Sequence, residues 1–491
     1  MGIPTLKGKF VPSQFIKVAQ RMTLDQKIVS GGNIVVTRNV GQVDFDSLIL
    51  LGKVLEHKPQ PDYFGFNIWL DASYPYVALI AGRRGTGKTY TLGVFAEGLA
   101  LTVKETHATT KNSSHALLIV DTLGQFWQMK HTAAARNEEE KQQLKQIADW
   151  GLHPCKVERT QVYVPAGTKI LDDWKELRLL FSDVQVSELA ALMNVDLYQD
   201  RMGQLLYHVY SKVTEEGYQT ATLDENTGTL VIGSSVKPKR NFEVNDLIQC
   251  IDRDHEVISP TVGFEVQTRR ALRSRLEVIS RWKIFSSSGT AISEVFKKGY
   301  ATVLNLEGID EDLRNLIVGV VVRKIFQARE STRKKEKLAE VDASVPLENS
   351  VAVPQGWILI DEAHEFCPAA GSTASKQVLI KLAKEGRSLG LGLIIATQQP
   401  SALSEKVSSQ VELVVSHALA FAADIRSLTD RFVNSVPDKY EHPAETLTFE
   451  QQIRLLPPGT AMVSAVGMPR VFLAMVRPRL ALHGGRAPKM D

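Results

Sequence analysis

The feature that most constrains the fold of this chain is a glycine-rich turn between an apolar run and a helical pattern. The run from Tyr76 to Ala81 predicts a buried parallel strand, and residues 90–100 repeat apolar side chains with helical spacing. The turn between them reads Gly82-Arg-Arg-Gly-Thr-Gly-Lys-Thr89. This strand–loop–helix arrangement is a P-loop, in which backbone N–H groups and a helix N-terminus surround phosphate groups. The sequence therefore predicts a nucleoside triphosphate site.

The residues of this loop have separate expected roles. Glycine lets the backbone pass close to the phosphates. Lys88 is expected to reach the β- and γ-phosphates, and the Thr89 hydroxyl is expected to hold Mg²⁺. The expected nucleotide-binding residues are contiguous: Gly82, Arg83, Arg84, Gly85, Thr86, Gly87, Lys88, Thr89 and Tyr90. ATP and Mg²⁺ are the expected cofactors.

Composition narrows the class of protein. The net charge of +3 over 491 residues excludes a strongly basic nucleic-acid coat, although local basic surfaces remain open. The three cysteines are far apart and form no CxxC pair, which favours a reducing compartment without structural disulfides or a zinc knuckle. The sequence shows no apolar run near the ~18–20 residues that cross a bilayer, and no secretory or myristoylation signal. A cytoplasmic protein without a membrane partner is expected.

The order of predicted elements divides the chain into five parts. Residues 1–75 predict a small β-rich region that could form a shortened barrel. The ATPase core is expected in two parts, residues 76–127 and 296–440, separated by a mainly helical insertion at 128–295. Residues 441–491 predict a β-rich C-terminal tail or arm. The predicted fold class is α/β, a RecA-like (ASCE) P-loop NTPase with a parallel sheet.

The middle of the chain contains a predicted hairpin, a predicted surface loop and two basic clusters. Residues 221–232 predict a hairpin, and the polar stretch 331–350 predicts a surface loop. Two basic clusters lie in the predicted insertion, at Lys237–Arg240 and at Arg269–Lys283. The second cluster spreads over more than one helical face. It predicts either a solvated helix surface or a surface that faces phosphate or another subunit.

Carboxylates follow two further apolar runs. Trp357–Ile360 predicts a strand that ends at Asp361 and Glu362, the Walker B pattern. Asp361 is expected to hold Mg²⁺ directly or through water, and Glu362 is expected to polarise a water against the γ-phosphate as a general base. Asp121 ends the apolar run that begins at His115. It could contact nucleotide or a neighbouring subunit, or it could cap the following turn.

The tetrapeptide Asp361-Glu-Ala-His364 also resembles a DEAH-box RNA helicase. In that family both motifs share one compact lobe, whereas here Lys88 and Asp361 lie 273 residues apart. The chain after the next predicted strand is also too short for a second lobe. His364 and Cys367 have no further ligands at zinc spacing, so a metal pair is not expected.

Two more polar residues lie near predicted strand and helix ends. Leu391–Thr397 predicts a strand followed by Gln398. An amide at that position could bond both the γ-phosphate and the attacking water, or it could be structural. The predicted helix 373–389 carries Glu385-Gly-Arg387.

These motifs together resemble the HerA branch of the HerA/FtsK superfamily of ring-shaped DNA-pumping ATPases. The resemblance rests on the P-loop, the Asp-Glu-Ala-His strand end, the Glu-Gly-Arg helix and the Ala-Thr-Gln-x-Pro-Ser strand end. The stretch Val476–Arg479 with His483-Gly-Gly485 also resembles HerA-like C-terminal segments. The resemblance spans roughly 60–485 and is loose within 130–295. Members usually carry an N-terminal β-barrel.

The resemblance implies a homohexameric DNA translocase or helicase with nucleotide at subunit interfaces. The implied catalytic residues are Lys88, Glu362, Gln398 as a γ-phosphate sensor, and Arg387 as a finger reaching a neighbour's γ-phosphate. Gln399 departs from the family, where many relatives have Arg. The implied partners are DNA and either a NurA-type nuclease or a phage-defence effector. An ATP-gated scaffold that switches an effector is the alternative. A conjugation-type coupling ATPase is disfavoured, because those proteins usually carry transmembrane helices.

Overall fold

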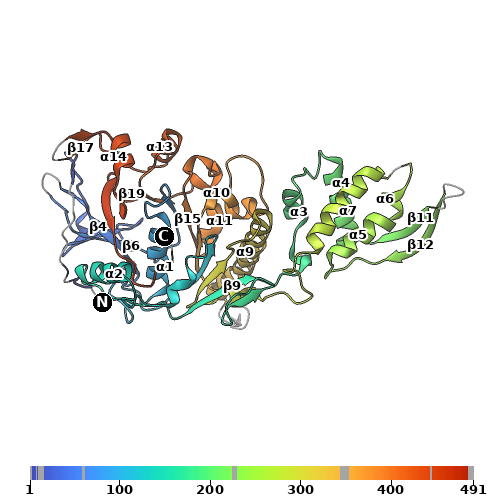
Figure 1. Ribbon diagram of the computed structural model, residues 1–491, viewed down its shortest axis with the longest axis horizontal. Helices are drawn as coiled ribbons and strands as arrows, with labels where there is room; N and C mark the ends of the chain where they lie inside the picture. Colours follow the sequence, from blue (N-terminus) through green and yellow to red (C-terminus); the bar gives the residue numbers. More distant parts are fainter. Residues whose placement is uncertain are drawn as a thin grey trace.

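The computed structural model describes residues 3–6, 8, 16–57, 61–223, 229–261, 263–342, 353–442 and 445–484. Figure 1 shows a core of strands flanked by helices and, at one end of the long axis, a separate lobe of helices with one hairpin. The predicted hairpin strands are present, and their turn at 224–228 lies outside the described residues.

The core is one 14-stranded sheet in which eight adjacent strands run parallel. In spatial order the parallel strands are β10 (Lys175–Leu177), β9 (Thr160–Pro165), β13 (Ala301–Asn305), β8 (Ala116–Asp121), β14 (Gly356–Ile360), β15 (Leu391–Thr397), β7 (Val77–Ala81) and β16 (Leu413–Ser416). The predicted α/β fold with a mostly parallel sheet is confirmed. Parallel neighbours place the carboxyl ends of β7, β8, β14 and β15 at one edge, where α/β proteins bind ligands.

The N-terminal and C-terminal strands extend this same sheet. After β16 follow β19 (Thr460–Ala465), β20 (Phe472–Val476), β4 (Leu48–Val54), β6 (Asn67–Asp71), β3 (Asn33–Val36) and β2 (Val29–Ser30). Antiparallel pairing of β20 with β4 connects the C-terminal strands to the N-terminal strands. A second sheet contains β18 (Thr446–Leu447), β17 (Tyr440–Glu441), β1 (Ile16–Lys17) and β5 (Glu56–His57).

Side chains of the parallel strands alternate between two apolar clusters, one on each face of the sheet. In β7, Leu79 belongs to one cluster and Ile80 to the other. The face with Ile80 is covered by α1 (Lys88–Ala100), and the opposite face by α9 (Glu311–Val341) and α11 (Lys376–Leu389). Strands buried on both faces require the near-continuous apolar runs seen in the sequence. The remaining core helices are α2 (Glu138–Asp149), α8 (Ile292–Val295), α10 (Ala363–Phe366), α12 (Glu405–Ser408), α13 (Ala422–Thr429) and α14 (Phe449–Leu455).

The lobe, here called the helical module, lies within residues 178–285. It contains α3 (Val186–Leu192), α4 (Arg201–Ser211), a π-helical turn (Lys212–Glu216), β11 (Tyr218–Leu223), β12 (Leu230–Val236), α5 (Val244–Arg253), α6 (His255–Ile258) and α7 (Val266–Ser280). The segment 128–295 thus contributes β9 and β10 to the core sheet as well as this module.

The predicted surface loop at 331–350 is wrong for its first part. α9 continues to Val341, and ion pairs such as Arg329–Glu336 and Arg333–Glu340 lie along it. Lys and Glu are good helix formers, so a polar run of this composition extends a helix rather than ending it. Residues 343–350 lie outside the described residues. Across the described ranges, none of the helices combines the length and apolar character needed to span a bilayer.

Candidate nucleotide-binding site

The predicted strand, loop and helix of the P-loop are present. β7 ends at Ala81 and α1 begins at Lys88, with Gly87 as its N-cap at φ 112°. This left-handed backbone is one that glycine adopts at little cost. At Gly82 a Cβ atom would lie 2.8 Å from both His417 Cβ and Thr86 Oγ1, so this position has no room for a side chain.

The Walker B carboxylates lie directly against the P-loop lysine and threonine. Lys88 Nζ donates to Asp361 Oδ1 at 2.7 Å and to Glu362 Oε1 at 2.6 Å. Thr89 Oγ1 donates to Asp361 Oδ2 at 2.9 Å. The structure therefore joins residues that are 273 positions apart in sequence into one hydrogen-bonded cluster.

This cluster is almost completely buried. The side chains of Lys88, Asp361 and Glu362 are 5%, 1% and 6% exposed. Burial alone would lower the pKa of Lys88, but the two carboxylates outweigh it and raise the pKa above its ordinary value. Lys88 thus stays charged, and its single positive charge is shared between the two acids.

Gln398 belongs to the same cluster through Glu362. Its Nε2 donates to Glu362 Oε1 at 2.5 Å. Glu362 adopts φ 50° and ψ 46°, a left-handed conformation that is uncommon for a residue with a Cβ and is typical of functional sites. Its Oε2 has no hydrogen-bond partner among the described residues, and His364 Nδ1 lies 3.6 Å away.

Asp121 caps the turn that follows β8, one of the two alternatives left open by the sequence. Its carboxylate accepts backbone N–H groups from Leu123 at 3.3 Å, Gln125 at 3.1 Å and Phe126 at 2.8 Å. Burial raises its pKa to about 6. The side chain is fully buried, so its contacts stay within this chain.

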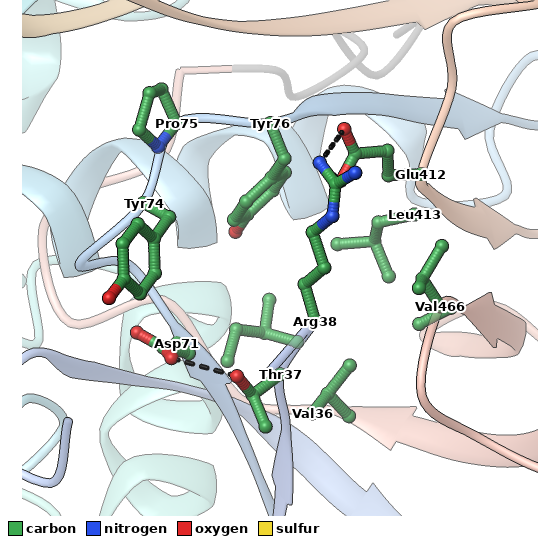
Figure 2. Close-up of a pocket in the computed structure, with 12 residues that line it drawn as sticks. Val36, Thr37, Arg38, Asp71, Tyr74, Pro75, Tyr76, Glu412, Leu413 and Val466 are labelled. Atoms are coloured by element: carbon green, nitrogen blue, oxygen red, sulfur yellow. Dashed lines mark hydrogen bonds and ion pairs between the residues drawn. The ribbon is translucent and has the colours of Figure 1, made fainter. Parts of the chain in front are cut away.

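Arg387 lies at the opposite edge of the sheet. It is near the C-terminus of α11, just before β15 begins, and its Nη1 is 3.9 Å from Glu412 Oε1. Glu412 precedes β16 and also pairs with Arg38 at 3.0 Å, beside a small pocket bounded by Tyr74 and Tyr76 (Figure 2). This pocket therefore lies at the amino ends of β7 and β16, away from the P-loop, and Arg387 does not reach its own chain's site.

His417 is a site residue that the sequence did not reveal. It follows β16, is completely buried and packs against the P-loop, with its Cβ close to Gly82. Its Nδ1 lies 2.7 Å from the Thr460 carbonyl oxygen and its Nε2 lies 2.8 Å from Thr91 Oγ1. A carbonyl only accepts, so Nδ1 carries the proton and Nε2 accepts from the threonine. Burial lowers the pKa of His417 to about 4, and the ring is neutral near pH 7.

A second unanticipated group clamps the P-loop helix from the C-terminal segment. Glu97 of α1 accepts from Arg477 Nη1 at 2.9 Å and from Arg479 Nε at 3.0 Å, and all three side chains are fully buried. Tyr90 accepts a hydrogen bond from the Arg479 backbone N–H at 2.6 Å, and its ring packs edge-on against His483 at 5.0 Å. The C-terminal residues that resemble HerA-like proteins therefore hold α1 in place, except Gly485, which lies outside the described residues.

Cations of the two basic clusters have acceptors within the helical module. Lys239 pairs with Asp246 at 2.6 Å. Arg273 pairs with Asp252 and with Glu277, each at 3.0 Å. Arg275 donates to a backbone carbonyl at 2.6 Å. These contacts favour the solvated helix surface over a dedicated phosphate-facing surface.

A parallel sheet with a P-loop and an Asp–Glu strand end at one edge defines a RecA-like P-loop NTPase fold. The family model "Helicase HerA, central domain" matches residues 78–325, about half of the chain, and the chain belongs to this family. A model of the zonular occludens toxin (Zot) family matches residues 283–450.

Curated relatives agree with this family. The DNA double-strand break repair helicase HerA of Sulfurisphaera tokodaii is 32% identical over 175 residues, which are 36% of this chain and 28% of the relative. The protein of the same name from Pyrococcus furiosus is 25% identical over 177 residues, which are 33% of this chain and 30% of the relative. The matched stretches thus span less than a third of these relatives. Among solved structures, VirB4 of Thermoanaerobacter pseudethanolicus aligns over 89% of this chain and 98% of its own, with 14% identity and a TM-score of 0.45.

Proposed function

We propose that this protein is an ATP-hydrolysing DNA translocase or helicase motor of the HerA type. The observation that carries the proposal is the buried contact of Lys88 and Thr89 with Asp361 and Glu362. A lysine for phosphates, a hydroxyl and a carboxylate for a metal, and a second carboxylate for water are the parts that P-loop hydrolases use.

The donor set fits Mg²⁺–ATP. Mg²⁺ prefers oxygen ligands, and the Thr89 hydroxyl and Asp361 carboxylate are the two that would hold it. When bound, it neutralises charge that develops on the phosphates. The loop before α1 provides the backbone groups for the phosphates: Gly82 has no room for a side chain, and Gly85 and Gly87 adopt positive φ.

Lys88 Nζ donates to both carboxylates, and binding phosphates would require it to give up at least one of these bonds. Phosphates that accept from Lys88 release Glu362, which can then take a proton from water. Gln398 donates to Glu362, and this contact supports a role in orienting that water and in sensing the γ-phosphate.

We further propose that hydrolysis requires assembly, with homohexamers as the active form. Arg387 is 47% exposed at the edge of the sheet opposite to the P-loop. A finger residue there can act only on the nucleotide of another copy, and such a residue contributes about 10³–10⁵ in rate. By analogy with the family, we propose that the ring binds DNA in its centre. We also propose that a nuclease or effector protein binds outside the ring.

An ATP-gated scaffold for an effector is the second candidate. The internal pairing of Arg273 and Lys239 favours it, because these cations are already neutralised and contribute less to DNA binding. Strand displacement separates the two functions. A motor displaces an annealed or triplex strand only with ATP, and Lys88→Ala abolishes displacement while the exposed control Lys104→Ala retains it. ATP-dependent assembly without displacement would contradict the motor.

A further inference from the structure

A histidine and two carboxylates converge in the helical module, in a different part of the molecule from the P-loop (Figure 1). His208 comes from α4, Asp254 from the junction between α5 and α6, and Glu256 from α6. One ligand atom from each lies within 4.8 Å of the other two. The described residues contain no other such group of three His, Cys, Asp or Glu side chains.

The spacing of these atoms matches a metal site. His208 Nε2 is 3.5 Å from Asp254 Oδ2 and 3.6 Å from Glu256 Oε2. Zn²⁺ bonds of about 2.0–2.2 Å in tetrahedral geometry place neighbouring ligand atoms about 3.3–3.6 Å apart. These separations are too long for hydrogen bonds with good geometry.

Two of the three ligand atoms, Asp254 Oδ2 and His208 Nε2, also lack other partners among the described residues. Asp254 is fully buried, and its Oδ1 already accepts from the Glu256 N–H at 3.3 Å. Its Oδ2 and His208 Nε2 have no hydrogen-bond partner among the described residues. A buried carboxylate oxygen without a donor is costly, and a cation shared with the imidazole would remove that cost.

The local backbone adds a second sign of a functional site. His208 lies one turn before a π-helical stretch, Lys212–Glu216. π-Helical turns are rare and are frequent at functional sites. Lys212 Nζ lies 3.1 Å from Glu256 Oε2 and equally close to Glu216 Oε2, so it can retain Glu216 when Glu256 binds an ion.

We propose that His208, Asp254 and Glu256 bind a divalent transition-metal ion, with Zn²⁺ the best match to one nitrogen and two oxygen donors. His208 and Glu256 are 29% and 45% exposed, which leaves one side open for entry and for a water ligand. The ion fixes α4 to the α5–α6 junction and so stiffens the module. Mere ion pairing by a protonated His208 is the competing explanation.

The test uses the full chain, freed of metal by chelation and dialysis, and titrated with ZnCl₂ in a calorimeter without nucleotide. Wild type and the control His107→Gln, an exposed histidine outside the group, should share one binding event that His208→Gln lacks. Losing a ligand should weaken Zn²⁺ at least ~100-fold, the upper range for second-shell partners. Glu256→Gln provides a second variant at an exposed position, should His208→Gln fold poorly.

Lys212→Gln gives the sharpest discrimination. Removing a competing cation should tighten Zn²⁺ binding severalfold, and Zn²⁺ should raise the thermal midpoint of this variant and of wild type but not of His208→Gln. If wild type and His208→Gln bind the same number of Zn²⁺ ions with the same affinity, the proposal is overturned. If Lys212→Gln binds Zn²⁺ no better than His208→Gln, the competing ion-pair explanation holds.

Discussion

Glu97→Gln should loosen the P-loop helix from the C-terminal segment. The Glu97 carboxylate accepts four hydrogen bonds, two from the buried guanidinium groups and two from the backbone N–H groups of Leu480 and Ala481. A neutral amide leaves Arg477 and Arg479 buried without a counter-charge. Breaking a buried pair in this way costs about 3–5 kcal/mol.

Hydrogen exchange measured by mass spectrometry reports the free energy of local opening, because α1 opens as part of a cooperative unit. At 1.4 kcal/mol per tenfold change, peptides covering 88–100 and 472–481 should exchange about 10²–10⁴ times faster in Glu97→Gln. Glu277→Gln is the matched control, since its pair with Arg273 is exposed and worth only about 0.2–1 kcal/mol. Equal exchange rates in the two variants would refute the claim that Glu97 attaches α1 to the C-terminal segment.

The same contact has a predictable pH dependence. Burial alone would raise the pKa of Glu97, but Arg479 and Arg477 outweigh it and lower the pKa below its ordinary value. A carboxylate with a lowered folded-state pKa stabilises the fold above its unfolded-state pKa, and this stability is lost as pH falls through the folded-state pKa. The ratio of exchange rates between Glu97→Gln and wild type should therefore be largest near pH 7. It should decrease in acid, as Glu97 of the wild type becomes protonated.

Three further substitutions test other parts of the site. Arg387→Ala should lower ATP turnover of the assembled protein by about 10³-fold or more and leave nucleotide binding intact; turnover that is normal in hexamers would exclude the trans finger. His417→Ala should raise the KM for ATP more than it lowers kcat, because it leaves the Thr460 carbonyl unpaired behind the P-loop at a cost of about 1–3 kcal/mol. An unchanged KM would exclude a positioning role. Gln398→Ala should lower kcat with little change in ATP affinity, measured by nucleotide binding and steady-state turnover, and a purely structural glutamine would instead lower the thermal midpoint alone.

The predictable parts of the molecule are those with local signals. An apolar run followed by a polar residue identifies both a parallel strand and its ligand edge, and this locates Asp361 and Gln398 beside the P-loop. The P-loop glycines are equally readable, because their spacing reflects a backbone requirement.

The parts that could not be predicted depend on distant partners. Glu97 lies in the apolar second half of α1, and nothing near it in sequence indicates two arginines some 380 residues later. His417 follows a short strand with no pattern of its own. The position of Arg387 at the far edge becomes clear only when α11 is seen to end beside the start of β15.

The central claim, that Lys88 and Glu362 form a hydrolytic ATP site, is tested most directly by ATP turnover of Glu362→Gln with nucleotide binding measured in parallel. Loss of a general base costs about 10²–10⁴ in rate. The account predicts that Glu362→Gln binds ATP at least as well as wild type, because Lys88 loses one competing carboxylate, while DNA-stimulated hydrolysis falls by at least about 10²-fold. Hydrolysis at the wild-type rate in Glu362→Gln would contradict it.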